Sequence, residues 1–322
     1  MKSFNWRKLA KLIPIIGLSL FAYIIYDIGI GKIVDSFSKI PIEYLAISLI
    51  LLIPRFLLFS YGWYYLCKKQ KMYPGYFFLL KTYFIGIFYG NVIPGGIGGH
   101  IRILYLKEKA KATLEKCLTN SMIESSSLFL SGLFVAFIGS IYLFDKAPGV
   151  LPIVTVFLCF HTTAFFVLMR KQTGSKIFKF FIKYLIPKKF KDKISDSVDA
   201  LYEDIPRTRN IIISFIIHIM VRLVATTQVY MIALALGADV PFIDFFFIHA
   251  LAVVAIGILP ISPGGVGIRE GMFIYLLAPY GVAPEIAFTI SFTGFLAKML
   301  IPSCIGAALS LKKEYRIDLT NE

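Results

Sequence analysis

The chain has 322 residues, of which 57% are hydrophobic and 16% are charged, and it contains 30 phenylalanines. With a mean hydropathy of +0.75, this composition excludes a soluble globular domain and indicates an all-α integral membrane protein. A net charge of +15 would suggest nucleic acid as the partner of a soluble chain. Here the lysines and arginines gather beside apolar runs, so we expect anionic membrane lipids as partners and no nucleic acid.

Six apolar runs are near or above the roughly 20 residues that a membrane-spanning helix needs. They cover residues 11–28, 43–66, 118–144, 150–169, 210–236 and 285–311. The first run follows a basic start and resembles a signal sequence, but no small-residue cleavage site comes after it. We therefore expect it to remain as the first helix.

Two shorter apolar stretches, 76–93 and 242–260, lead directly into loops rich in proline and glycine. The apolar runs after these loops, 103–106 and 272–280, are too short to cross a bilayer. We predict a re-entrant hairpin at each place. The expected fold is therefore about six full transmembrane helices plus two re-entrant hairpins.

Basic segments indicate which loops lie on the cytoplasmic side. They are the N-terminus and residues 68–71, 107–116, 170–209 and 312–313, whereas 29–42 and 237–244 lack this bias. The pattern predicts a multi-pass membrane protein with both termini in the cytoplasm. The longest basic segment, 170–209, interleaves lysines with aromatic residues, which fits either a helix in the head-group layer or an ordinary cytoplasmic loop.

The whole chain, 1–322, is predicted to be a single polytopic membrane domain made of two halves, 11–144 and 150–311. Each half has the order span, span, hairpin, span. An odd number of crossings in each half turns the second half upside down in the membrane. Inverted repeats of this kind are common in transporters.

Spacing supports the repeat. The interval from Arg55 to Pro74 is the same as the interval from Arg222 to Pro241. A Pro-Gly-Gly motif then follows each of these prolines at nearly the same distance, beginning at Pro94 in the first half and at Pro263 in the second. Arg55 and Arg222 are therefore predicted to be equivalent positions in the two halves.

The two proline-glycine loops cannot continue an α-helix, because proline lacks a backbone donor and each glycine costs about 1 kcal/mol relative to alanine. Unpaired backbone cannot face lipid, so these loops are expected to line the protein interior or a watery cavity. A glycine-rich bend before a helix can also bind an anion, and cationic side chains follow here: His100, Arg102 and Arg269. Packed helix breaks are the alternative. The loop residues are Pro94, Gly95, Gly96, Gly98, Gly99, Pro263, Gly264, Gly265 and Gly267.

Arg55 and Arg222 lie inside apolar runs, where an unpartnered cation costs roughly 2.5–3.5 kcal/mol, so both are expected to face the bundle interior. Lys298 is a third deep cation. Glu124 and Glu270 are the candidate acidic partners. The arginines are predicted either to bind a lipid head group or to form structural ion pairs, Arg55 with Glu124 and Arg222 with Glu270.

The sequence contains no metal-ligand spacing, no catalytic triad and no nucleophile motif, so we expect no metal, no cofactor and no catalytic residue. Its four cysteines, which have no CxxC spacing, are expected to be free. Three histidines lie singly in apolar segments, at His161, His218 and His249.

The motifs at 94–102 and 260–271 resemble the flippase-like transmembrane domain of bacterial lysyl-phosphatidylglycerol synthases, and the likeness covers almost the whole chain. The first motif departs at His100, where many relatives have an acidic residue. The resemblance implies a protein of a prokaryotic cell membrane that moves an amphiphilic lipid or a lipid-linked head group between leaflets. The soluble synthase domain of two-domain relatives would follow the last span, and the chain continues only to Glu322 after Leu311. We therefore expect a stand-alone membrane domain without enzyme activity. A separate lipid-modifying synthase is then a candidate partner.

The predicted function is translocation of an anionic or aminoacylated phospholipid through a polar cavity. The two loops, with Arg102, Arg269, Arg55 and Arg222, would form that cavity. A secondary transporter of a small solute fits the inverted repeat equally well. A membrane-embedded transferase acting on a lipid phosphate, with Glu124, Glu270 or His249 as base, is the other alternative.

Overall fold

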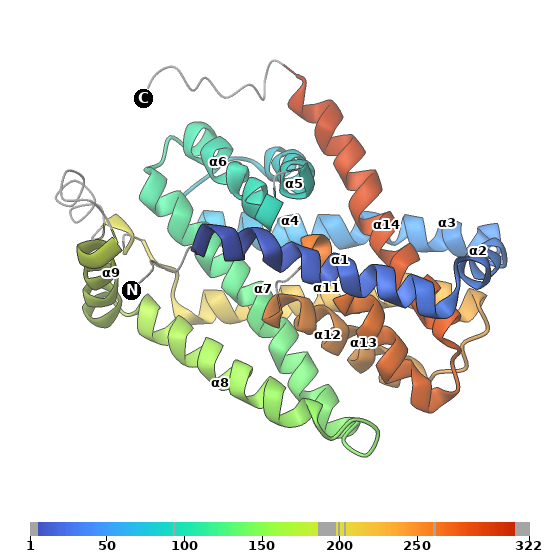
Figure 1. The fold of residues 1–322 in the computed structure, drawn as a ribbon. Helices are drawn as coiled ribbons and strands as arrows, with labels where there is room; N and C mark the ends of the chain where they lie inside the picture. The colour runs from blue at the N-terminus through green and yellow to red at the C-terminus, as the bar shows by residue number, and fades with distance from the viewer. Residues whose placement is uncertain are drawn as a thin grey trace.

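A computed structural model describes residues 6–92, 94–185, 198, 200–202, 204–259 and 262–312. Every regular element in these ranges is a helix, which confirms the all-α class (Figure 1). The first half contains α1 (Trp6–Ile28), α2 (Ile30–Ser38), α3 (Ile42–Ile50), α4 (Leu52–Lys69), α5 (Tyr76–Val92), the 3₁₀ helix η1 (Pro94–Ile101), α6 (Arg102–Ala110) and α7 (Leu114–Tyr142). The second half contains α8 (Val150–Met169), α9 (Lys171–Leu185), α11 (Thr208–Ala235), α12 (Phe242–Ile258), η2 (Pro263–Gly265), α13 (Ile268–Leu277), η3 (Ala278–Tyr280) and α14 (Pro284–Ser310).

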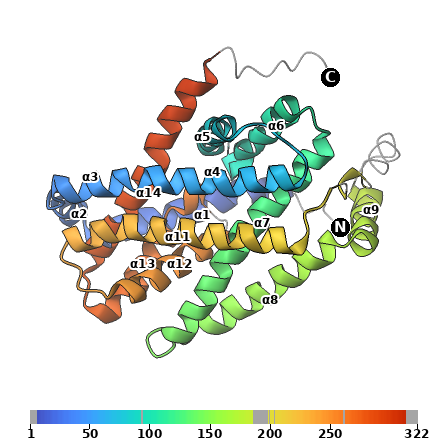
Figure 2. The ribbon, with the colours of Figure 1, turned by 180° about the vertical axis from the view of Figure 1, so that it is seen from behind.

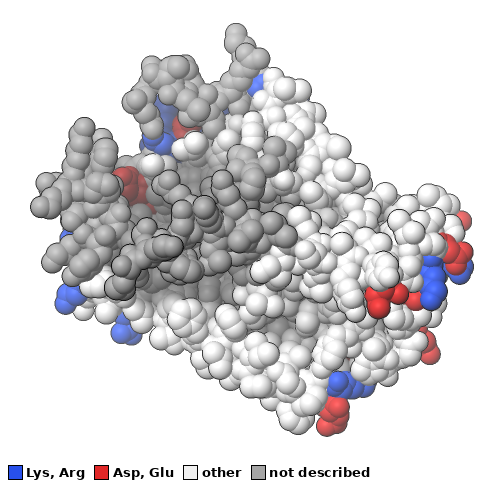
Figure 3. Space-filling view, in the orientation of Figure 1, with Lys and Arg blue, Asp and Glu red and all other residues white. Residues whose placement is uncertain are grey.

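Five helical stretches are long and apolar enough to cross a membrane, and all five overlap predicted spans. They are Ile42–Lys69, which joins α3 and α4, and the helices α7, α8, α11 and α14. The sixth predicted span, 11–28, lies within α1, whose stretch Leu18–Ile28 is a shorter apolar helix. In Figure 3, charged side chains gather toward two opposite ends of the visible face, with uncharged ones between them, as a membrane-spanning protein requires.

At each predicted hairpin, two helices are joined at a glycine segment. α5 and α6 contact each other around η1, and α12 contacts α13 around η2. The two glycine segments, η1 and η2, also contact each other. The helix breaks of the two halves therefore meet inside the molecule.

The two halves exchange partners. Helices α4 and α11 lie side by side, as Figures 1 and 2 both show. Around them, α5 of the first half packs against α14 of the second, and α12 of the second half packs against α7 of the first. The first helices of the two halves are not placed equivalently: α1 contacts α13, whereas α8 contacts α7 and α9.

The predicted basic loop 170–209 begins with a helix, α9, which packs against the end of α8. Residues 186–197 of that loop lie outside the described residues. Farther along, Asp204 accepts from Lys71 at 2.6 Å and from Lys116 at 2.7 Å. These three residues belong to three of the segments predicted to be cytoplasmic, so one cluster joins them. The hydrogen bonds from Lys116 and Lys71 lower the pKa of Asp204 below its usual value.

Candidate functional site

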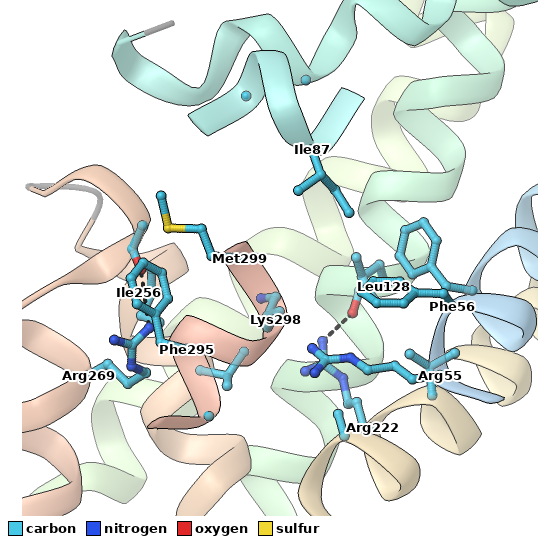
Figure 4. Close-up of a pocket in the computed structure, with 18 of the residues that line it drawn as sticks. Arg55, Phe56, Ile87, Leu128, Arg222, Ile256, Arg269, Phe295, Lys298 and Met299 are labelled. Carbon is cyan, nitrogen blue, oxygen red and sulfur yellow. Dashed lines mark hydrogen bonds between the residues drawn. The ribbon is translucent and has the colours of Figure 1, made fainter. Parts of the chain in front are cut away.

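A cavity of about 580 Å³ lies where the two halves meet (Figure 4). Both glycine segments reach it, through Gly99 and Gly264, and so does the exposed side chain of His100. Its walls combine apolar side chains such as Phe56, Ile87 and Met299 with cationic ones. The lysines and arginines that line it are Arg55, Arg102, Arg222, Arg269 and Lys298, all of which were predicted from the sequence.

Arg102 begins α6 and is buried. Its Nη2 donates to Oε2 of Glu124, on α7, at 2.5 Å. The guanidinium also lies over the indole ring of Trp63, 4.8 Å from the ring centroid. A carboxylate and an aromatic face thus compensate this cation within the protein.

Arg269, in the first turn of α13, has an equivalent environment. It is buried, it pairs with its neighbour Glu270, and its Nε donates to the hydroxyl of Ser291 at 3.0 Å. Its guanidinium lies 4.1 Å from the ring centroid of Phe295. Each half therefore places one neutralised, ring-stacked arginine at the cavity.

These contacts correct the predicted structural ion pairs. Arg55 does not pair with Glu124, and Arg222 does not pair with Glu270, within the described part of the chain. Glu124 faces the start of α6 instead, where Arg102 lies. Glu270 turns back along its own helix toward Arg269.

Among the described residues, Arg55 and Arg222 are bound only by neutral groups. Nη1 of Arg55 donates to Oε1 of Gln228, on α11, at 2.6 Å. Arg222 donates from Nε to the hydroxyl of Ser131 at 3.1 Å and from Nη2 to the carbonyl of Leu128 at 2.5 Å. Both side chains point into the cavity (Figure 4) and repel each other electrostatically. Neither charge is cancelled by a carboxylate among the described residues.

Lys298 lines the cavity from α14 and is exposed to it. It has neither a hydrogen bond nor an ion pair with any residue that the structure describes. The charges of Arg55, Arg269 and Arg222 repel its ammonium group. Pro302, one turn later in the same helix, cannot donate to the carbonyl of Lys298, so the backbone ladder lacks a bond at this level.

The second glycine loop needs its glycines. Gly264, Gly265 and Gly267 have φ angles of 63°, 74° and 89°, a left-handed region that residues with a side chain rarely adopt. The predicted anion nest is partly filled from within, because the N–H of Gly267 donates to Oε2 of Glu270 at 2.7 Å. Positions 260 and 261 of this motif lie outside the described residues.

The first loop is built differently. Residues 94–101 form a 3₁₀ helix, η1, so the break in α-helix after Val92 was predicted but its regular geometry was not. Gly86 of α5 packs closely against Gly99, whose carbonyl oxygen lies 3.0 Å from where a β-carbon on Gly86 would be. A side chain at position 86 would therefore push the two backbones apart.

Sequence reasoning missed the neutral partners of the arginines: Gln228, Ser131, Ser291 and Trp63. A constant sequence interval between equivalent positions of the two halves could have predicted some of these partners. One and the same sequence interval separates Arg55 from Arg222, Arg102 from Arg269, Glu124 from Ser291, and Ser131 from Lys298.

His218 is a further buried polar group, and its neighbours were not predicted from the sequence. It is fully buried, with Nε2 at 3.9 Å from Oε1 of Glu124 and Nδ1 at 3.4 Å from the hydroxyl of Ser127. His249 hydrogen bonds to Thr226 at 2.8 Å and lines the cavity. Among the described residues, no three acidic, histidine or cysteine side chains group as a metal site would require.

The helices and the cavity together define a polytopic α-helical membrane protein with a cationic chamber in its interior. The chain belongs to the family described as the lysylphosphatidylglycerol synthase TM region, whose model matches residues 10–306. This confirms the family resemblance of the two motifs.

Similar chains occur in archaea. A UPF0104 membrane protein of Pyrococcus horikoshii is 21% identical over 94% of this chain and 96% of its own length. A UPF0104 membrane protein of Methanothermobacter thermautotrophicus is 23% identical over 91% of this chain and 92% of its own, and one of Methanocaldococcus jannaschii is 23% identical over 92% of both. This chain therefore matches membrane proteins of about its own length.

Proposed function

We propose that this protein moves a lipid with an anionic head group between the leaflets of the cell membrane through the cationic cavity. The observation that carries the proposal is the composition of the cavity wall, where Arg55, Arg222 and Lys298 lie among apolar side chains. An amphiphile needs both kinds of surface, because its phosphate requires charge-assisted hydrogen bonds while its tails stay in an apolar environment. A small polar solute does not require the apolar part.

The two neutralised arginines and the three other cations have different roles in this proposal. Arg102 and Arg269 hold the starts of α6 and α13 in place through their carboxylates and rings. Arg55, Arg222 and Lys298 bind the head group, because no protein carboxylate among the described residues competes for them. The loops bring η1 and η2 to the cavity but leave phosphate binding to side chains.

The two halves work as inverted repeats in this proposal, with the hairpins α5–α6 and α12–α13 entering the membrane from opposite sides. The exchange of partners supports this, since α5 packs against α14 and α12 against α7. Rocking of one half against the other would expose the cavity to each leaflet in turn. In this proposal both termini lie in the cytoplasm. The cluster around Asp204, which joins three basic segments, supports this orientation.

Lipid movement in proteoliposomes tests the proposal. Purified protein is reconstituted with fluorescent phospholipids, and the outer leaflet is bleached with a membrane-impermeant reductant. Protein-dependent bleaching of inner-leaflet lipid is expected for wild type and is expected to be lost in Arg55→Gln/Arg222→Gln. Wild-type movement no faster than in protein-free liposomes, across phosphomonoester, phosphodiester and aminoacylated lipids, would contradict it and favour a small-solute transporter.

A further inference from the structure

We infer that the head group taken by this cavity carries at least two negative charges, as a phosphomonoester or a diphosphate does. A singly charged phosphodiester, or one made neutral or cationic by an aminoacyl group, is a poorer ligand. This inference rests on the proposed function and names its substrate class. It depends on which charges in the cavity remain uncompensated.

Five cationic side chains line the cavity, and two of them are neutralised by protein carboxylates. Glu124 takes Arg102, and Glu270 takes Arg269. Glu124 is the only acidic residue among the described residues of the cavity wall. Three positive charges are left, at Arg55, Arg222 and Lys298.

These three charges act on one another. Arg55 and Arg222 repel each other, and Lys298 is repelled by both as well as by Arg269. An unpartnered cation inside a membrane is costly on insertion scales, so a site that keeps three is unfavourable when empty. A ligand with two or more negative charges removes most of that cost. A ligand with a single charge leaves two cations unpaired, and an aminoacyl ammonium group adds a further repulsive charge.

The free donors match such an anion. Arg55 uses Nη1 on Gln228, which leaves Nε and Nη2. Arg222 uses Nε and Nη2, which leaves Nη1, and Lys298 offers all three N–H groups of its ammonium. A terminal phosphate has three oxygens that can accept charge-assisted bonds from these donors, whereas a phosphodiester has two.

Lys298 is the residue that adds the third charge. It follows Ser131 at the same sequence interval that relates the paired arginines of the two halves. Ser131 binds Arg222 as a neutral hydroxyl, so its counterpart could have been neutral too. Lys298→Ser therefore gives both halves the same residue and lowers the uncompensated charge to two.

The experiment measures binding and movement separately. Purified wild-type protein in a neutral detergent at pH 7 is titrated with dioctanoyl phosphatidic acid, dioctanoyl phosphatidylglycerol and a dioctanoyl lysyl-phosphatidylglycerol. Inorganic phosphate and pyrophosphate are titrated alone, to tell a lipid ligand from a free anion. Phosphatidic acid is expected to bind at least tenfold more tightly than the other two lipids, and more tightly than either inorganic anion.

Lys298→Ser is expected to reduce that preference by about tenfold while weakening phosphatidylglycerol binding less. Lys39→Ser is the matched control, because Lys39 is exposed and lies outside the cavity. If Lys298→Ser does not fold, the preference of the wild-type protein for phosphatidic acid over the other two lipids still tests the inference. Equal or tighter binding of the singly charged or aminoacylated lipid overturns the inference, and tighter binding of inorganic phosphate or pyrophosphate than of phosphatidic acid overturns a lipid ligand.

The same lipids in proteoliposomes separate the two proposals. Movement of phosphatidylglycerol that is faster than that of phosphatidic acid would overturn the inference and keep the translocator. Tight binding of phosphatidic acid without movement of any lipid would overturn the translocator and keep the charge requirement of the cavity.

Discussion

Nη1 of Arg55 donates to Oε1 of Gln228 at 2.6 Å, so a neutral amide joins the two central helices at a point where a carboxylate of the same size would fit. Gln228→Glu places a negative charge there and neutralises Arg55 within the protein. We expect lipid movement to fall by about tenfold, because one of the three free charges is lost, while thermal stability is kept or increased. Movement at the wild-type rate, with the variant shown to be folded, would remove Arg55 from head-group binding. Gln228→Leu, which leaves Arg55 charged and unpaired, is the comparison.

Breaking the ion pair between Arg102 and Glu124 is expected to destabilise the fold. Both side chains are buried, and Glu124→Gln leaves Arg102 without its carboxylate. The loss is expected to be about 3–5 kcal/mol, as for other buried pairs in which one charge is left alone. The free energy of unfolding in mixed micelles measures it. The double variant Arg102→Gln/Glu124→Gln should recover part of that loss, and a larger loss in the double variant than in Glu124→Gln would show that the charge pairing is not the cause.

Gly267→Ala is expected to destabilise the second loop by more than about 1 kcal/mol, since its φ of 89° is strained for any residue with a β-carbon. The same change would disturb the N–H that donates to Glu270. Gly149→Ala is the control, because Gly149 has a φ of −67° and open space around it. Thermal unfolding of the two variants beside wild type measures the difference. Equal midpoints for both variants would show that the loop tolerates a side chain.

Asp204→Asn tests the cluster that joins three basic segments. The hydrogen bonds from Lys116 and Lys71 lower the pKa of Asp204, so this carboxylate stabilises the folded state at pH values above its unfolded pKa. That stabilisation is lost as the pH falls through the lower, folded pKa. Thermal midpoints measured between pH 3 and pH 7 should therefore show wild type above the variant at pH 5 to 7, and the two should converge below pH 4. A constant difference across the range would contradict this account.

Hydropathy and spacing predicted the order of spans, the two glycine breaks and the cations of the cavity, because each depends on local composition. The partners of the arginines could not be predicted. Glu124 faces Arg102 because of the direction in which α7 presents it, and Glu270 reaches Arg269 because it folds back within the same turn. Such directions depend on packing between helices. The stretch 29–42, expected only as a connection between spans, contains helix α2, which packs against α14.

Pro302 separates two polar contacts of α14. Before the proline, Ser291 accepts a hydrogen bond from Arg269 in the second hairpin. After it, Ser303 bonds to Asn91 and the helix belongs with α5 of the first hairpin. The missing backbone bond falls at the turn that carries Lys298, so a bend of α14 at this turn would also move the ammonium group. In the proposed translocator, opening of the cavity and the position of its third charge would thereby be coupled through one helix.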